Sequence, residues 1–141
     1  MSRVAAAAAV VVHRGHVLLV RRRNPPDAGL WGYPGGHRAP GESVARTATR
    51  ELAEETGIVA APLGLLAVLA VARFRLAMVA CRHIRGAPRP DDDVDLAHWV
   101  PVREVLGRRR AMSRDVDLIL VRALLSRAGR PPGCCTSPTW R

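Results

Sequence analysis

The 141-residue chain contains no lysine, few aromatic residues and only three cysteines. Its 22 basic residues are therefore all arginine, and against 12 acidic residues they give a net charge of +10. One phenylalanine, one tyrosine and three tryptophans are too few and too scattered to form a stacking surface for single-stranded nucleic acid. The composition thus argues against a dedicated nucleic-acid-binding protein, although a positive field would still attract a small phosphate-bearing molecule.

Cysteine usage and the lengths of the apolar runs exclude two further classes of protein. Cys134 and Cys135 are adjacent and Cys81 stands apart, so their spacing supports neither a zinc site nor a disulfide framework. The apolar run at the N-terminus ends at Val12 and is followed by charge, well short of the roughly 20 residues that span a membrane. We therefore expect no cleaved signal, no membrane span and a cytoplasmic location.

The length and the distribution of residue types predict one domain. A chain of 141 residues can bury roughly two thirds of the surface that its unfolded form exposes. Residues 130–141 are rich in proline, glycine and serine and show no hydrophobic periodicity. We expect a single domain over residues 1–129, a disordered tail over residues 130–141, and a monomer or a homodimer.

Residues 36–58 carry the strongest pattern in the chain. Ser43 suits an N-cap, Gly57 suits a left-handed C-cap, and most residues between them favour a helix. Val44, Ala48 and Leu52 recur every four positions, which predicts a buried stripe. The segment therefore predicts an amphipathic helix.

The polar side of this helix places three glutamates on one face. Glu51, Glu54 and Glu55 are spaced i, i+3 and i+4, where like charges repel by roughly 0.2–0.5 kcal/mol per pair. A divalent cation would turn this repulsion into binding, and Mg²⁺ or Mn²⁺ prefers carboxylate oxygens, water and substrate phosphates. Arg50, one turn before Glu54, can orient part of the cluster. We therefore expect Mg²⁺, with Mn²⁺ as the alternative, at this face.

The same segment resembles the signature of the Nudix hydrolases, G-x5-E-x7-R-E-U-x-E-E-x-G-U, in which U is a bulky aliphatic residue. Trp31, Pro34 and Gly35 also resemble the residues that precede this signature in the family. The resemblance covers roughly residues 3–129 and implies an α/β fold, an α/β/α sandwich with a mixed β-sheet. All of the fixed positions are filled, by Gly36, Glu42, Arg50, Glu51, Leu52, Glu54, Glu55, Gly57 and Ile58.

The resemblance also implies a reaction and a role for each central residue. Nudix hydrolases use a divalent metal to cleave a nucleoside diphosphate linked to another group, which yields a nucleoside monophosphate and the phosphorylated group. Glu51 and Glu55 would be the principal metal ligands, and Glu54 a further ligand or the base that orients water. Arg50 would hold the carboxylates in place, and the backbone carbonyl of Gly35 would join the metal shell.

Four further residues have two possible roles each. Glu42 either binds the metal as an outer ligand or pairs with Arg46 one turn on. Arg22 and Arg23 either form the solvated end of a strand or hold a substrate phosphate. Asp93 is either a further acid, as metal ligand or general base, or part of a soluble loop.

The remaining periodicity predicts strands and a second helix. Two β-branched segments on either side of Gly15 predict a hairpin, and residues 64–71 and 74–84 predict two central strands. A last short strand is expected at residues 98–101. The second amphipathic helix is expected to follow Ser113 as its N-cap.

The expected function is a pyrophosphohydrolase acting on a small nucleoside diphosphate derivative. ADP-ribose, a nucleotide sugar, and an oxidised or ordinary nucleoside triphosphate all remain possible. The ADP-ribose branch of the family commonly has a proline where this chain has Arg73, and the dinucleoside polyphosphate branch has a tyrosine downstream of the signature, whereas Tyr33 lies upstream. Two alternatives are a catalytically silent Nudix domain that senses a nucleotide and a basic nucleic-acid-binding protein.

Overall fold

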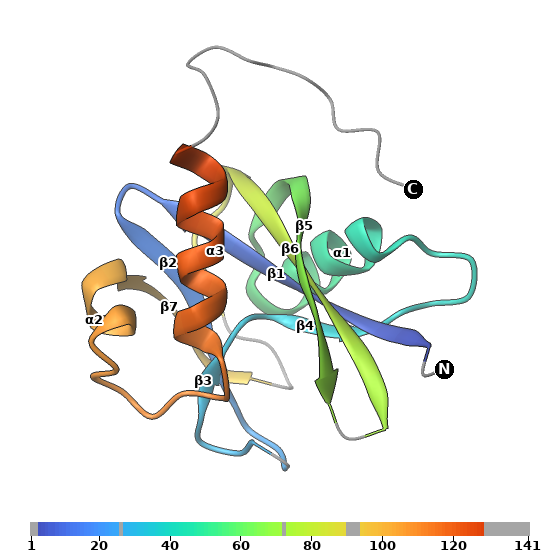
Figure 1. Ribbon diagram of the computed structural model, residues 1–141, viewed down its shortest axis with the longest axis horizontal. Coiled ribbons are helices and arrows are strands. Elements are labelled where there is room, and N and C mark those ends of the chain that lie inside the picture. Colours follow the sequence, from blue (N-terminus) through green and yellow to red (C-terminus); the bar gives the residue numbers. More distant parts are fainter. Residues whose placement is uncertain (1–2, 26, 72, 90–93, 129–141) are drawn as a thin grey trace.

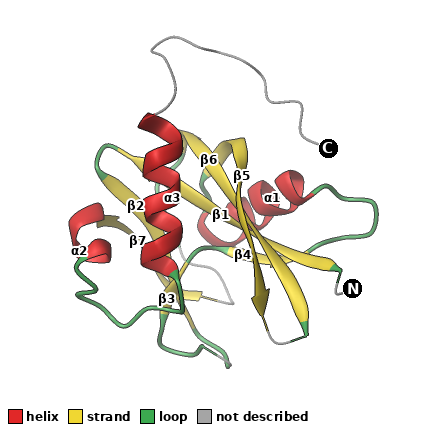
Figure 2. Ribbon diagram, in the orientation of Figure 1, coloured by secondary structure: helices red, strands yellow, loops and turns green. Residues whose placement is uncertain are grey.

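The computed structural model describes residues 3–25, 27–71, 73–89 and 94–128, and these form seven strands and three helices. A mixed β-sheet lies between helix α1 on one side and helix α3 on the other (Figure 1, Figure 2). The expected α/β fold is thereby confirmed. The elements are β1 (Val4–His13), β2 (His16–Arg22), β3 (Trp31–Gly32), β4 (Gly35–His37), α1 (Val44–Thr56), β5 (Val59–Val71), β6 (Phe74–Arg85), β7 (Val94–Pro101), α2 (Val102–Leu106) and α3 (Val116–Ala128).

Strand β1 connects the two halves of the sheet. Its last residues pair antiparallel with β2, Val12 opposite Val17, which confirms the predicted hairpin. Its first half pairs antiparallel with β4, Ala7 opposite Gly36, and parallel with β6 on the other side. Among the described strands the order is β3-β2-β1-β6-β5, with β4 on β1 and β7 on β2. β1 therefore joins the short glycine strand β4 to the body of the sheet.

The alternation of side chains along β1 builds a core on each face of the sheet. Ala7 and Ala9 pack on the α1 side with Leu52, which is completely buried. Val10 packs on the α3 side with Leu120. The many alanines of β1 leave little side-chain volume between the sheet and its covering helices, so backbone segments approach one another closely.

Helix α1 begins and ends where its sequence predicts. The Ser43 hydroxyl accepts a hydrogen bond from the backbone N–H of Arg46 at 3.1 Å, as an N-cap does. Gly57 has φ +76° and donates its N–H to the Ala53 carbonyl oxygen, which ends the helix in the left-handed conformation that glycine adopts without strain. Both caps lie within the segment itself, so α1 is fixed at each end by local sequence.

The prediction for the second helix is wrong at its N-terminus. Helix α3 begins at Val116, and the Ser113 hydroxyl instead donates to the Asp27 carboxylate at 2.9 Å. The periodicity also misses α2, because five residues are too few to show a helical repeat. Residues 130–141, the expected tail, lie outside the described part of the chain. Within that part, none of the helices has the length and apolar character needed to cross a membrane.

Candidate active site

Arg50 contacts three glutamates at the polar side of α1. Its Nε and Nη2 donate to the two carboxylate oxygens of Glu42 at 2.8 and 3.0 Å. Its Nη1 donates to Glu51 at 2.9 Å and to Glu54 at 3.2 Å. Nη2 also donates to the backbone carbonyl oxygen of His37 at 3.0 Å. One guanidinium therefore joins three carboxylates to the end of β4.

Glu42 is the most enclosed of the carboxylates that Arg50 contacts, with a side chain 8% exposed. Besides Arg50, it accepts the Thr47 hydroxyl at 2.7 Å and the Ala39 backbone N–H at 3.1 Å. The hydrogen bond from Arg50, supported by the one from Thr47, lowers the pKa of Glu42 from 4.5 to about 2. The same bond raises the pKa of Arg50 above its usual value. Glu42 thus pairs with Arg50 and not with Arg46, so the partner expected from i+4 spacing is wrong.

The two glycines of β4 bring backbone against the carboxylates of α1. A Cβ atom at Gly36 would lie 2.4 Å from the carboxyl carbon of Glu51, a distance that no real contact allows. The backbone N–H of Gly35 donates to Glu55 Oε2 at 3.1 Å. Glu51 and Glu55 therefore lie against the backbone of β4, because Gly36 and Gly35 have no side chains to separate them from it.

The donor set fits a hard divalent cation. Glu51, Glu54 and Glu55 offer only carboxylate oxygens, and the absence of a Cβ at Gly36 lets the Glu51 carboxylate lie against the backbone of β4. Among the described residues, no three acidic, histidine or cysteine side chains already converge on one point. Arg50 Nη1 lies 2.9 Å from Glu51 and 3.2 Å from Glu54, so both of these carboxylates face the guanidinium. The residues are those a metal would use, and the one positive charge of Arg50 against three contacted carboxylates leaves the cluster net negative.

Two of the remaining candidate residues lie elsewhere in the sheet and one is outside the described residues. Arg22 is the last residue of β2 and Arg23 follows it, and both side chains are exposed. β2 pairs with β3 and β7, whereas the glycine strand pairs with β1, and no described contact joins either arginine to the glutamates. Asp93 lies outside the described part of the chain.

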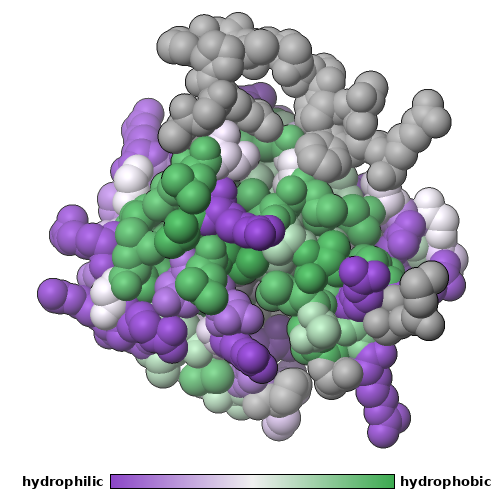
Figure 3. Space-filling model, viewed as in Figure 1, coloured by the Kyte–Doolittle hydropathy of each residue, from purple (hydrophilic) through white to green (hydrophobic). Residues whose placement is uncertain are grey.

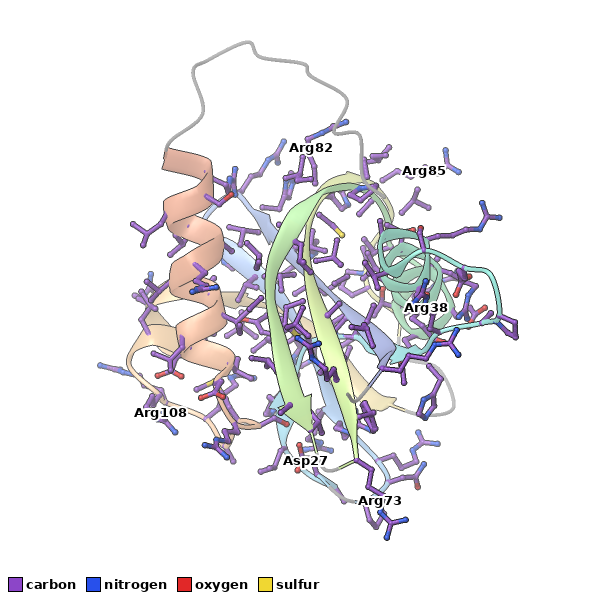
Figure 4. The ribbon with its side chains drawn as sticks, turned by 45° about the vertical axis from the view of Figure 1, so that its right-hand side comes forward. Asp27, Arg38, Arg73, Arg82, Arg85 and Arg108 are labelled. Atoms are coloured by element: carbon purple, nitrogen blue, oxygen red, sulfur yellow. The ribbon has the colours of Figure 1, made fainter. Side chains whose placement is uncertain are left out.

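Three residues in and before α1 support the site although the sequence pattern did not single them out. The His37 carbonyl accepts from Arg50, and the Thr47 hydroxyl, completely buried, donates to Glu42. Arg38, labelled beside α1 in Figure 4, donates to the backbone carbonyl of Glu42. The buried threonine could have been noticed, since it lies one turn from Ser43 on the apolar side of the helix.

Trp31 belongs to the core on the α3 side of the sheet. Its side chain is 8% exposed and its ring centre lies 5.3 Å from that of His98. The guanidinium carbon of Arg110 lies 4.7 Å from the Trp31 ring centre, within cation–π range. Cys81 is also buried, which raises the pKa of its thiol to about 12 and leaves it unreactive at neutral pH.

Comparison with protein families and curated proteins gives one consistent answer. The family model of the NUDIX domain matches residues 1–120. Phosphatase NudJ of Escherichia coli is 32% identical over 106 residues, which is 70% of this chain and 69% of that protein. The putative mutator protein MutT4 of Mycobacterium tuberculosis is 39% identical over 88 residues, 56% of this chain. That match spans only 36% of the length of MutT4.

Solved structures share the same fold. The ORF135 protein of Escherichia coli superposes with a TM-score of 0.71 at 27% identity and covers 94% of this chain and 96% of its own. The NUDIX domain of Shewanella oneidensis NrtR, solved in complex with ADP ribose, has a TM-score of 0.69 at 28% identity. The match to NrtR covers 91% of this chain and 90% of that one.

Proposed function

Because the chain belongs to the NUDIX domain family and is a Nudix hydrolase, we propose that it cleaves the pyrophosphate bond of a nucleoside diphosphate linked to a second group. The observation that carries this proposal is that Arg50 holds Glu51 and Glu54, and the Gly35 N–H holds Glu55, beside the two glycines of β4. A positioned carboxylate cluster beside open backbone is what metal-assisted phosphoryl chemistry requires.

The roles of the residues follow from their surroundings. Glu51 and Glu55, which lie against Gly36 and Gly35, would hold Mg²⁺, and Mn²⁺ would serve in its place. The bound cation would neutralise charge on the phosphate oxygens as the bridging bond breaks. Glu54 is the most exposed of the three, at 57%, and is therefore open to an incoming water molecule. It would orient that water and accept its proton.

The reaction needs no other reactant besides water. The water oxygen bonds to one phosphorus while the bond from that phosphorus to the bridging oxygen breaks. The products are a nucleoside monophosphate and the phosphorylated second group, and the water proton passes to Glu54 and on to solvent. Arg50 keeps Glu51 and Glu54 aligned throughout, through the bonds that it makes to both.

For the substrate we propose ADP-ribose or a nucleotide sugar first, and a nucleoside triphosphate second. The relative solved with ADP ribose supports the first class, and the similarity to a putative mutator protein supports the second. The purified protein should be screened with Mg²⁺ or Mn²⁺ against ADP-ribose, nucleotide sugars, dinucleoside polyphosphates and ordinary or oxidised nucleoside triphosphates. The compound from which nucleoside monophosphate is released fastest identifies the class.

The metal assignment predicts that Glu55→Gln loses activity at least about 100-fold while the fold is retained, because an amide binds Mg²⁺ far more weakly than a carboxylate. Circular dichroism checks the fold, and the best substrate of the screen reports the rate. Glu104→Gln is the matched control, since Glu104 lies on α2 and pairs with Arg110. A folded Glu55→Gln protein with wild-type activity would show that the assignment is wrong.

A second candidate is a catalytically silent domain that senses a nucleotide. It is favoured by the similarity to a NUDIX domain that was solved with ADP ribose bound, and by the hydrogen bonds with which Arg50 engages Glu51 and Glu54. Binding of ADP-ribose without turnover of any compound in the screen would support the sensor. Oligonucleotide binding measured at several salt concentrations distinguishes a nucleic-acid-binding protein from both the hydrolase and the sensor. Its affinity would fall steeply as the salt concentration rises.

A further inference from the structure

Histidine and tryptophan side chains from four strands gather at the end of the sheet where β1 turns into β2. His13 of β1 lies directly opposite His16 of β2, so both side chains lie on the same face of the sheet. The ring centre of His13 lies 4.6 Å from that of His83 on β6 and 5.7 Å from that of Trp99 on β7. The rings of His83 and Trp99 meet edge to face at 5.6 Å. All four side chains are only partly buried, so part of each ring is open to a ligand.

His13, His16 and Trp99 line a hollow of about 340 Å³ together with Arg14. Small-molecule sites usually occupy about 300–1,000 Å³, so this volume suits a small ligand. Trp99 packs against the core on the α1 side of the sheet, and His13 alternates along β1 with Val11, which belongs to that core. The hollow therefore lies on a different face from the apolar surface over α3 and the β5–β6 pair, which Figure 3 shows.

Arg14 has a backbone conformation that disfavours arginine. It is the first of the two turn residues between β1 and β2 and has φ +49°, and Gly15 after it has φ +76°. A two-residue turn with both φ values positive prefers Asn-Gly. Arg108 also has a positive φ, +53°, but its guanidinium pairs with Asp117 at 3.2 Å. Within the described part of the chain, the Arg14 guanidinium forms no hydrogen bond or ion pair, as is typical of a residue kept in a disfavoured conformation for a ligand.

The surroundings of the hollow are positively charged. Desolvation lowers the pKa of His13, and the basic neighbours His83, Arg14 and Arg127 lower it further. Arg127 of α3 donates to the Val12 carbonyl oxygen at 3.0 Å, which places its guanidinium beside the hairpin. None of the four residues that line the hollow is acidic. The hollow therefore disfavours a cation and attracts an anion.

From these observations we propose that the hollow binds a nucleoside monophosphate. Its base would stack on the histidine and tryptophan rings, since every base has a face that stacks on aromatic side chains. Its phosphate would accept two hydrogen bonds from the Arg14 guanidinium, whose planar fork matches phosphate oxygens. This site is separate from the glutamate cluster and independent of the proposed hydrolysis, because Ala7, which pairs with Gly36, lies roughly 20 Å along β1 from His13.

Calorimetric titration of the full chain with AMP in the presence of a chelator tests the proposal. The chelator removes the metal that the glutamate cluster would use. One AMP should bind per chain with a Kd below about 1 mM, at least about 10-fold tighter than ribose 5-phosphate, which has no base. AMP that does not bind overturns the proposal, as would occur if another segment of the chain filled the hollow. AMP that binds no tighter than ribose 5-phosphate overturns it as well.

Arg14→Asn should weaken AMP binding at least about 10-fold, because asparagine suits the left-handed turn but has no guanidinium. Arg108→Asn is the matched control, since it makes the same substitution at another arginine with positive φ, and it should bind AMP like the wild type. Circular dichroism checks that both variants are folded. Equal affinity of the wild type and a folded Arg14→Asn protein would show that the phosphate is not held at the hairpin.

The NMR signals of the histidine rings locate the bound AMP. Those of His13 and His83 should shift on titration, whereas that of His98 should not, because its ring lies beside Trp31 on the other face of the sheet. His37 reports on the glutamate cluster, since its carbonyl oxygen accepts from Arg50. A shift at His37 without one at His13 would place AMP at the glutamate cluster and overturn the proposal, while leaving the proposed hydrolysis intact.

Discussion

At the scale of single residues, the adjacent glycines of β4 differ in what their missing side chains would meet. A Cβ at Gly35 would lie 2.5 Å from the Ala7 carbonyl oxygen and 2.7 Å from Ala8 Cα, both of which are backbone atoms. The three atoms nearest to a Cβ at Gly36 would all belong to the carboxylate end of Glu51, which can move. The first clash must distort the sheet, whereas the second displaces the Glu51 carboxylate.

Alanine at these two positions should therefore separate stability from activity. Gly35→Ala is expected to destabilise the fold by roughly 1–3 kcal/mol, as overpacking does. Gly36→Ala should melt near the wild-type temperature but lose about 100-fold in rate and require more Mg²⁺, because Glu51 is pushed out of place. Thermal denaturation and a Mg²⁺ titration of the hydrolysis rate measure the two effects.

The two variants serve as controls for each other, since they make the same substitution at neighbouring positions. If Gly36→Ala keeps both its rate and its Mg²⁺ requirement, Glu51 does not bind the metal. If Gly35→Ala is as stable as the wild type, the close approach of β4 to β1 does not constrain the sheet.

At the scale of elements, the loop between β4 and α1 is held by Glu42. This residue binds Arg50 of the helix, the Thr47 hydroxyl one turn into it, and the Ala39 backbone N–H of the loop itself. Arg38 adds a bond from the loop to the Glu42 carbonyl. The carboxylate therefore fixes the path by which the glycine strand enters the helix, and with it the position of Arg50.

The lowered pKa of Glu42 predicts how stability depends on pH. Its carboxylate has a folded-state pKa of about 2 against an ordinary value of 4.5, so folding favours the ionised form. The stabilisation is complete above pH 4.5 and is lost as pH falls through the folded-state value. Glu42→Gln should be less stable than the wild type at neutral pH, with a difference in melting temperature that shrinks below pH 4.5.

Melting curves of both proteins at a series of pH values measure that difference. Glu104→Gln on α2 is a suitable comparison, because it removes an acid that lies in a different salt bridge. A gap between wild type and Glu42→Gln that stays constant down to the lowest pH would contradict the role given to this carboxylate.

Elements whose signals are local were predictable from the sequence, and those fixed by distant contacts were not. Helix α1 has its caps, its apolar stripe and its glutamates in one continuous segment, and each is where the sequence places it. The partner of Glu42 was missed, since Arg50 is eight positions on and reaches it only because the loop folds back. Ser113 failed as a cap because Asp27, far away in sequence, takes its hydroxyl.

The residues of the candidate site also fall into those that the sequence predicts and those that only the structure reveals. The glutamates that a metal would use could be recognised from spacing alone, together with the glycines that give them room. The contributions of the Thr47 hydroxyl and the His37 carbonyl could not, because a buried threonine usually only packs and a backbone carbonyl carries no sequence signal. The tertiary structure supplies both.

At the scale of the whole molecule, the charge balance around Arg50 bears on what metal removal does. Its guanidinium contacts three carboxylates and so offsets part of their mutual repulsion without a cation. The hydrophobic cores on both faces of the sheet are separate from the cluster. The fold should therefore be stable without metal.

We predict that chelation abolishes hydrolysis but leaves a folded protein that unfolds cooperatively. Saturating Mg²⁺ should raise the melting temperature by only a few degrees, since a ligand at 100 times its Kd adds about 2.7 kcal/mol. Circular dichroism and thermal melts with and without chelator make the comparison. Loss of secondary structure on chelation would mean that the metal is structural, as in domains that fold only around their ion.

The alanines of β1 carry a consequence for how this protein can change by mutation. Ala7 and Ala8 are buried, so a larger side chain at either position would have to displace neighbouring atoms. Alanine and valine codons differ by a single base, so substitution of valine for one of these alanines needs only one mutation. Drift in a strand that contributes no catalytic group would then shift Gly35 and Gly36 against the glutamates. Substitutions in the alanines of β1 are therefore constrained by the candidate site, although none of these alanines belongs to it.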